Sequence, residues 1–239
     1  MATLTYIGLI FFLAGTLQGM TGFGSALVAM PLLCLFVDVQ TAVPLCTLNS
    51  IVITVYLMTK MKNHIDLTKV LPLCLSALPG SLVGVTLLHE IDAHLFKILL
   101  GLLLLGYGGY NLMFTATTRS LNPAWAWLAG FFSGAIGSAF SVGGPPAILY
   151  ATLNDWRKDE IKATLTAFFA FNSTLAALVH FFSGLTNSAV AKDFLISAPT
   201  VLLGAMLGYY WYQRTSHRIY MRVTFAFLIF MGGTMIIVA

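Results

Sequence analysis

Eight long apolar runs, almost free of charged side chains, constrain this chain more than any other feature. A helix needs about 20 apolar residues to cross the hydrocarbon of a bilayer. Hydrocarbon offers no water to the backbone, and the alternating pattern of a β-barrel is absent, so helices remain. We therefore expect an all-α, polytopic membrane protein with eight to ten membrane helices. The runs lie at about 4–37, 41–59, 67–88, 94–114, 124–153, 163–184, 194–212 and 220–238.

The composition excludes several classes of protein. Hydrophobic residues make up 59% of the 239 residues and charged residues 8%, with a mean hydropathy of +0.90. A soluble domain carries about 25% charged residues, so a soluble globular domain, a disordered chain and a secreted disulfide scaffold do not fit. Lys60 is the first basic residue, so no secretory signal is expected and the N-terminus is interpreted as a mature membrane segment. No basic surface for nucleic acid is expected either.

The cysteines and histidines do not form a recognisable metal motif. Cys34, Cys46 and Cys74 each lie in an apolar segment without paired spacing, which is typical of small core residues. His89 and His94 are five residues apart, so on a helix they would not share a face. We expect no metal site and no cofactor.

The chain contains an internal repeat. Leu-Ala-Gly followed by two further glycines begins at Leu13 and again at Leu128. Pro31 recurs as Pro146, and the pair Asn49-Ser50 recurs as Asn172-Ser173 in the same order. We therefore expect one integral membrane domain built from a first repeat, residues 1–118, and a second repeat, residues 119–239.

The basic residues predict how the repeats lie in the membrane, because cytoplasmic loops collect Lys and Arg. If each long first run turns back to its own side, ten basic residues share one face and only Lys97 and Lys192 lie on the other. The two repeats are then inverted, with both termini outside, which is a transporter architecture. The ten are Lys60, Lys62, Lys69, Arg119, Arg157, Lys158, Lys162, Arg214, Arg218 and Arg222.

The runs 4–37 and 124–153 are each expected to form a Gly-rich helical hairpin. Two arms of about 14 to 16 residues would rise only about 21 to 24 Å each, so the turns would lie inside the protein. Gly22 and Gly24 mark the first turn, and Gly143 and Gly144 mark the second. Pro145 and Pro146 suit the first turn of a restarting helix, whose N-terminus can bind an anion. Glycine pairs four residues apart instead predict close helix packing: Gly15/Gly19, Gly80/Gly84, Gly130/Gly134 and Gly204/Gly208.

At these hairpins the sequence resembles the sulfite exporter TauE/SafE family of membrane transporters. The resemblance rests on the duplicated LAGxxxGxxG start, on Gly-Gly-Pro-Pro at 143–146 and on the paired Asn-Ser, and it covers nearly the whole chain. It implies export of small sulfur-containing or organic anions such as sulfite or sulfonates, coupled to the proton gradient, across the inner membrane of a bacterium. The first hairpin has Ala29-Met30-Pro31 where the second has Gly-Gly-Pro-Pro, so the two halves of a site would bind differently.

Polar residues near the hairpins are the candidate ligands of that anion. Asparagine amides and serine hydroxyls can donate hydrogen bonds to it, although they can equally join neighbouring helices. Ser133 is a further candidate donor. The predicted substrate site comprises Gln18, Thr21, Gly22, Gly24, Ser25, Asn49, Ser50, Ser138, Ser141, Gly143, Gly144, Pro145, Asn172 and Ser173.

His180 lies well inside an apolar run and is the candidate for proton coupling, unless it simply reaches the outer interface. The charged stretch with Arg157, Lys158 and Lys162 is interpreted as a solvated cytoplasmic loop, or as a vestibule that attracts anions. No basic side chain is expected deep in a span.

The leading hypothesis is a secondary transporter with alternating access and a midplane site between the hairpins. Its partners would be a small anion and the lipid bilayer. The alternative is an uncoupled anion channel of the same fold. We do not expect an enzyme, because no flanking motif supports Ser25 and His180 as a catalytic pair.

Overall fold

The structure is a computed structural model that describes residues 2–113, 121–212 and 217–239. All regular elements in this part of the chain are helical. The first half forms five α-helices and a 3-10 turn: α1 (Ala2–Thr21), α2 (Ser25–Leu33), α3 (Val39–Met61), η1 (Lys62–His64), α4 (Leu67–Glu90) and α5 (Ala93–Met113). The second half forms α6 (Ala124–Phe140), α7 (Gly144–Leu153), α8 (Lys158–Phe182), α9 (Ser188–Tyr212) and α10 (His217–Ile237).

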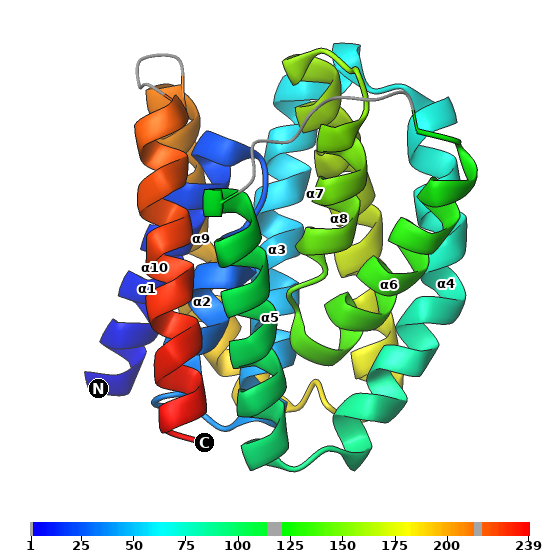
Figure 1. Ribbon diagram of the computed structural model, residues 1–239. Helices are drawn as coiled ribbons and strands as arrows, with labels where there is room; N and C mark the ends of the chain where they lie inside the picture. Colours follow the sequence, from blue (N-terminus) through cyan, green and yellow to red (C-terminus); the bar gives the residue numbers. More distant parts are fainter. Residues whose placement is uncertain (1, 114–120, 213–216) are drawn as a thin grey trace.

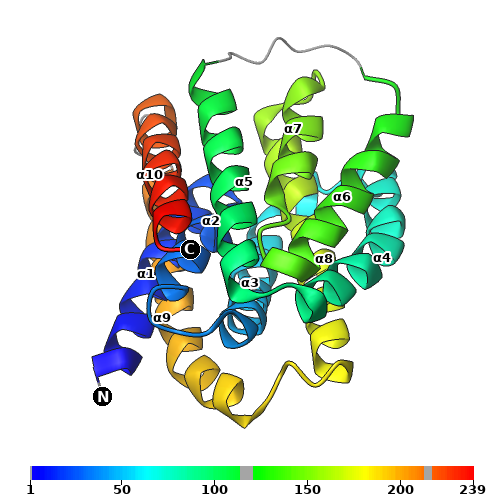
Figure 2. The same ribbon diagram turned by 60° about the horizontal axis from the view of Figure 1, so that its bottom comes forward.

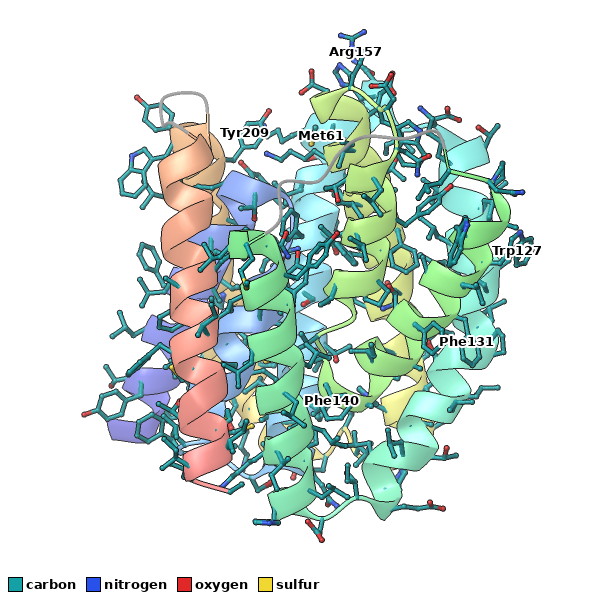
Figure 3. The ribbon with its side chains drawn as sticks, viewed as in Figure 1. Met61, Trp127, Phe131, Phe140, Arg157 and Tyr209 are labelled. Carbon is teal, nitrogen blue, oxygen red and sulfur yellow. The ribbon has the colours of Figure 1, made fainter. Side chains whose placement is uncertain are left out.

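The helices form one bundle in which neighbours in space are often distant in sequence (Figure 1). Helix α1 packs along α9, α4 along α6, α5 along α10, and α3 along α8. Both chain ends lie at the same end of the bundle, and Arg157 lies at the opposite end (Figures 1 and 3). Figure 2 shows that α5 and α10 stand together on one side, while α4 and α6 stand on another.

The prediction of an all-α protein with several membrane helices is confirmed for the described residues. Six helices are long and apolar enough to cross a bilayer, and Ala124–Phe140 and Phe225–Ile237 are shorter apolar helices. The six lie at Leu4–Thr21, Val39–His64, Leu67–Glu90, Ala93–Met113, Asp159–Phe182 and Ser188–Trp211.

The two long first runs each break into two helices, as predicted, but the predicted equal arms are wrong. Helix α1 has 20 residues and α2 has 9, while α6 has 17 and α7 has 10. Helix α1 is long enough to cross the hydrocarbon and α6 is nearly so, and little of each run is left for the second arm. A helix of 9 or 10 residues rises only about 15 Å, so α2 and α7 reach about halfway across the hydrocarbon core.

The two breaks use different residues. At the first, Gly22 and Gly24 have φ angles of +87° and +95°, in the left-handed region that glycine adopts without a Cβ penalty. At the second, Ser141 takes the left-handed conformation with φ +58°. Gly143 is needed there for close approach, because an added Cβ would lie 2.3 Å from the Ser133 carbonyl oxygen. Pro145 and Pro146 lie in the first turn of α7, as predicted.

The predicted packing glycines do pack helices together. An added Cβ at Gly15 or Gly19 would lie 2.3 Å from a carbonyl oxygen of α9, that of Val201 or Ala205. At Gly80 and Gly84 the corresponding distance is 2.1 Å, to carbonyl oxygens of α6. Gly130 and Gly134 face α4, and Gly204 and Gly208 face α1, in the same way. These surfaces bring the α1/α9 and α4/α6 backbones into direct contact.

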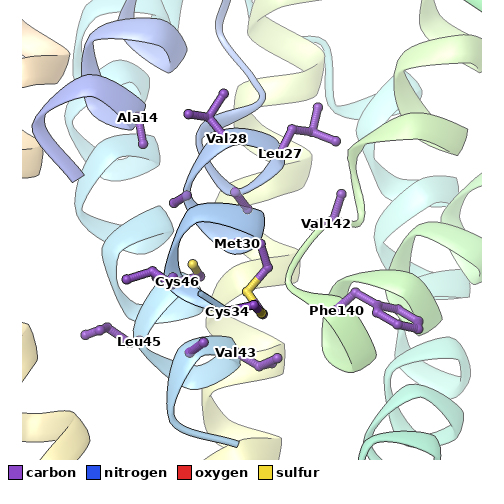
Figure 4. Packing of buried hydrophobic residues seen from close by; sticks show 14 of the residues in the cluster. Ala14, Leu27, Val28, Met30, Cys34, Val43, Leu45, Cys46, Phe140 and Val142 are labelled. Carbon is purple, nitrogen blue, oxygen red and sulfur yellow. The ribbon is translucent and has the colours of Figure 1, made fainter. Parts of the chain in front are cut away.

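The short helix α2 lies at the centre of the largest hydrophobic cluster. Leu27, Val28 and Met30 of α2 are buried and lie among side chains of α1, α3 and the α6–α7 turn (Figure 4). Cys34 and Cys46 belong to the same cluster and Cys74 to a second one; all three are buried free cysteines, as predicted.

Candidate functional site

A cavity of about 50 Å³ lies where the two short helices begin. This volume can hold a few water molecules or a small anion. Its lining comes from both halves of the chain: Gln18, Gly24, Ser25, Ala26, Leu27, Thr47, Ser50, Gly137, Ser141, Val142, Gly143, Gly144, Phe169, Asn172, Ser173 and Ala176.

Both short helices direct their N-terminal ends at this cavity. Ser25, Ala26 and Leu27 are the first three residues of α2, and Gly144 is the first residue of α7. The first N–H groups of a helix have no partner within it, and the aligned peptide dipoles place a partial positive charge there. None of the lining side chains is ionisable. The field in the cavity therefore favours an anion without holding a fixed full charge.

One polar side chain of each first arm fastens the helix that follows. Gln18 on α1 accepts hydrogen bonds through Oε1 from the backbone N–H of Ser25, at 3.3 Å, and from the Ser25 hydroxyl. Ser133 on α6 accepts one from the backbone N–H of Ala147, at 3.0 Å. Gln18 and Ser133 occupy the same position of the sequence repeat. Both turns are thereby attached to the arm that precedes them.

Helices α3 and α8 bring further polar groups to the cavity. The hydroxyls of Thr47 on α3 and Ser141 at the second turn are 3.0 Å apart. The Asn172 amide lies against Gly137, where an added Cβ would be 2.5 Å from Nδ2, and its Oδ1 is buried without a hydrogen-bond partner. Ser173 donates to the Phe169 carbonyl at 2.6 Å. Oδ1 can only accept a hydrogen bond, so the group of Asn172 that can donate to an anion is its Nδ2 amide.

The structure brings nine of the fourteen predicted site residues to the cavity. They are Gln18, Gly24, Ser25, Ser50, Ser141, Gly143, Gly144, Asn172 and Ser173.

The other five predicted residues lie outside this lining. Thr21 donates to the carbonyls of neighbouring residues of its own turn, and Gly22 lies against the stem of Lys162. Asn49 donates to Ser197 on α9 at 2.8 Å, which is the helix-joining role that the sequence left open. Ser138 lies beside His180, and Pro145 lines a different pocket, between α5 and α7.

His180 is buried rather than exposed at an interface. Its exposed fraction is 0%, and Nε2 donates to the Ser138 carbonyl on α6 at 2.8 Å. Nδ1 is buried and has no hydrogen-bond partner. The Ser25 hydroxyl donates a hydrogen bond to Gln18, not to His180. Ser25 and His180 therefore have separate hydrogen-bond partners.

Lys162 differs most from its sequence interpretation. The expected solvated loop is the beginning of α8, and Lys162 is only 5% exposed. Its Nζ lies 3.5 Å from the Met20 carbonyl oxygen and 5.6 Å from the centre of the Tyr209 ring. Lys162 lies one turn into α8, so it differs from the expected solvated side chain in its burial by the protein. Local charge density suggested a loop, and only the contact with the end of α1 explains the burial.

The end of the bundle that carries Arg157 is charged (Figure 3). Lys69 on α4 forms an ion pair with Glu160 on α8 at 2.9 Å, and its Nζ lies 4.8 Å from the centre of the Trp156 ring. Asp66 accepts hydrogen bonds from the hydroxyl and the backbone N–H of Thr68, and these lower its pKa. Arg119 and Arg214 lie outside the described residues, as do the side chains of Lys158, Arg218 and Arg222.

Comparisons with known proteins agree with this architecture. The profile of the family described as "Sulfite exporter TauE/SafE" matches residues 7–235. A protein of Cupriavidus necator named "Probable sulfite/organosulfonate exporter TauE" is 28% identical, over 95% of this chain and 91% of its own length. No solved structure is significantly similar to the chain. The chain, with its multi-pass helical bundle, belongs to the sulfite exporter TauE/SafE family of membrane anion exporters.

Proposed function

We propose that this protein is a secondary transporter that exports sulfite or small organosulfonates through the cavity between α2 and α7. One observation carries the proposal: two helix N-termini, one from each half of the chain, meet at a single cavity without ionisable side chains. Partial charges and amide donors can hold an anion and still release it. The name of the Cupriavidus necator relative supports the sulfur-containing substrate.

In this proposal residues 1–118 and 119–239 are inverted repeats, each opening with a Gly-rich helical hairpin. The helix contacts support the relation. If α1 to α5 correspond to α6 to α10, the α1/α9 contact corresponds to α6/α4, and α3/α9 corresponds to α8/α4. Helix α3 packs against its counterpart α8, and α5 packs against its counterpart α10. Inverted repeats favour alternating access, in which one half moves against the other around a midplane site.

We propose that His180 couples export to the proton gradient. An imidazole changes charge near physiological pH, and the unpartnered Nδ1 of His180 can accept a proton. Nε2 donates to the carbonyl of Ser138, in the last helical turn of α6 before the second break. Protonation would therefore alter the contact that holds α6 against α8.

Flux in proteoliposomes tests the function. The purified protein is reconstituted, and uptake of sulfite, sulfoacetate and a carboxylate control is measured with and without a pH gradient. We expect saturable flux of sulfite or sulfoacetate that follows the gradient. His180→Gln keeps a hydrogen-bond donor but cannot titrate in this range, so it should retain exchange and lose the response to the gradient.

Other results would reject parts of the proposal. Fast, non-saturable flux driven only by membrane potential would identify an uncoupled anion channel. A preference for the carboxylate would remove the substrate class, and flux that is insensitive to pH would remove the coupling. Absence of flux of all three anions in folded protein would reject transport through this cavity.

A further inference from the structure

One face of α8 runs past the cavity from end to end. Residues separated by alternating steps of four and three lie on the same side of a helix. The cavity-lining residues Phe169, Ser173 and Ala176 follow this spacing. The complete series is Lys162, Thr166, Phe169, Ser173, Ala176 and His180.

This face carries a basic side chain on either side of the cavity. Lys162 lies two turns before Phe169, toward the end that carries Arg157, and His180 lies one turn after Ala176. They are 18 residues apart, or about 27 Å along the helix. That distance approaches the thickness of the hydrocarbon core. This face therefore extends over most of the hydrocarbon thickness, with the cavity between its two basic side chains.

Lys162 fills the space between the cavity and the charged end of the bundle. Its stem lies on Gly22, where an added Cβ would be 2.8 Å from Cγ. Gly22 directly follows the end of α1, one helical turn after Gln18, and Gln18 lines the cavity. Tyr209, whose ring lies 5.6 Å from Nζ, is near the same end of the bundle as Arg157 (Figure 3). The lysine thus lies directly beyond the cavity in that direction.

Thr166 provides an independent sign of a ligand path between Lys162 and the cavity. It lies one turn from Lys162 on the same face, its exposed fraction is 0%, and its Oγ1 has no hydrogen-bond partner. Buried hydroxyls are normally bonded, and a threonine in a helix can bond to its own backbone. An open hydroxyl at this place is available to an anion that passes.

We propose that Lys162 is the gate of the anion path on the Arg157 side of the cavity. Its aliphatic stem closes the path over Gly22, and its ammonium is positioned to attract an anion of the sulfonate class toward Thr166 and the cavity. A buried cation is costly in a membrane protein and marks a functional place. The Met20 carbonyl at the end of α1 and the Tyr209 ring hold it in position. The inference rests on the proposed function for its substrate, but its test does not require transport.

A thiol probe at Ser173 measures access past Lys162. The full chain with Ser173→Cys reacts in detergent with a methanethiosulfonate that carries either a sulfonate or a trimethylammonium group. The parent chain provides the background from buried Cys34, Cys46 and Cys74. We expect the sulfonate reagent to react faster. Lys162→Met should lower the ratio of the two rates about tenfold, as expected from losing one nearby charge.

Matched variants test whether the positive charge of Lys162 is the cause of the rate ratio. Lys162→Arg should preserve the ratio, and Lys192→Met, at an exposed lysine of α9, should leave it unchanged. If Lys162→Met does not fold, Lys162→Gln replaces it. An unchanged ratio in the uncharged variants overturns the proposal, and so does a failure of both reagents to reach the Ser173→Cys thiol in any background. If sulfite flux is absent but the ratio falls as expected, the gate stands and the proposed transport function fails.

Discussion

The asparagines at equivalent places in the two halves have different surroundings. Asn172 lines the cavity, whereas Asn49 lies outside its lining and donates through Nδ2 to Ser197 on the neighbouring helix. Oδ1 is buried without a partner in both residues. The sequence repeat predicts the same role for both. One half of the chain thus uses the position to join helices, and the other half places it in the wall of the cavity.

Replacing each asparagine by alanine should separate these roles. Asn172→Ala should raise KM for sulfite about tenfold, because a hydrogen bond from the Nδ2 amide to a charged ligand contributes about 1.5 kcal/mol. The unfolding temperature should remain nearly unchanged. Asn49→Ala should cost about 1 kcal/mol of stability and leave KM unchanged. Flux in proteoliposomes and thermal unfolding in detergent measure both. The reverse pattern would contradict the different roles.

Gly24 can be compared with Gly184, because both have positive φ angles, +95° and +74°. Alanine at either position should cost about 1 to 2 kcal/mol of stability through the left-handed backbone alone. Only Gly24 lines the cavity. A Cβ added at Gly24 would lie 3.2 Å from the Leu17 side chain, whereas a Cβ added at Gly184 would have no neighbour within 4 Å. Flux per folded molecule should therefore fall in Gly24→Ala and persist in Gly184→Ala. Equal flux in the two variants would contradict a role of the first turn in binding.

At the scale of elements, helix contacts at glycine position the two first arms. Helices α1 and α6 are each held along a long helix of the other half, α9 and α4. The short helices α2 and α7 are held by buried side chains in the two hydrophobic clusters. Gln18 and Ser133 add hydrogen bonds to the beginnings of these helices. Gln18 and Ser133 each occupy one backbone N–H of these short helices, and the first residues of α2 and α7 still line the cavity.

Gly84→Ala and Gly106→Ala test this packing within one half. A Cβ added at Gly84 would lie 2.1 Å from the Ala135 carbonyl oxygen, whereas a Cβ added at Gly106 would have no neighbour within 4 Å. Gly84→Ala should cost about 1 to 3 kcal/mol because backbone must separate from backbone, and Gly106→Ala should be neutral or stabilising by up to about 1 kcal/mol. Thermal unfolding in detergent measures the difference. Equal unfolding temperatures would show that α4 and α6 do not depend on this contact.

At the scale of the whole molecule, the chain ends and the Arg157 end lie on opposite sides of the bundle (Figures 1 and 3). Basic residues with described, exposed side chains follow the same division. Lys60 and Lys62 lie at the Arg157 end, and Lys192 lies near the start of α9 at the opposite end. From the positive-inside rule we predict that the Arg157 end faces the cytoplasm.

Cysteine labelling tests this orientation. Lys62→Cys should react with a membrane-impermeant thiol reagent only after cells are opened, whereas Lys192→Cys should react in intact cells. The unsubstituted chain gives the background for both. Labelling of Lys62→Cys in intact cells would reverse the orientation and place both chain ends in the cytoplasm.

Much of this architecture was readable from local patterns along the chain. Apolar runs predicted the helices, glycines four residues apart predicted the close contacts, and Pro145 with Pro146 predicted the restart of a helix. Nine of the predicted site residues line the cavity because the repeat indicated where the chain breaks. Each of these signals depends on neighbours in sequence or on a spacing that a helix turns into a face.

Only the tertiary structure decided which polar residues line the cavity, join helices or become buried charges. Asn49 and Asn172 look equivalent in sequence, and Lys162 looks like part of a loop. Their surroundings come from α9, α6 and the end of α1, all distant in sequence. The sequence by itself determined a helical membrane bundle with two glycine-marked breaks, because hydrophobicity and backbone freedom are local properties. The tertiary structure decided which side chains meet at the cavity, because burial and hydrogen bonding depend on contacts between distant parts of the chain.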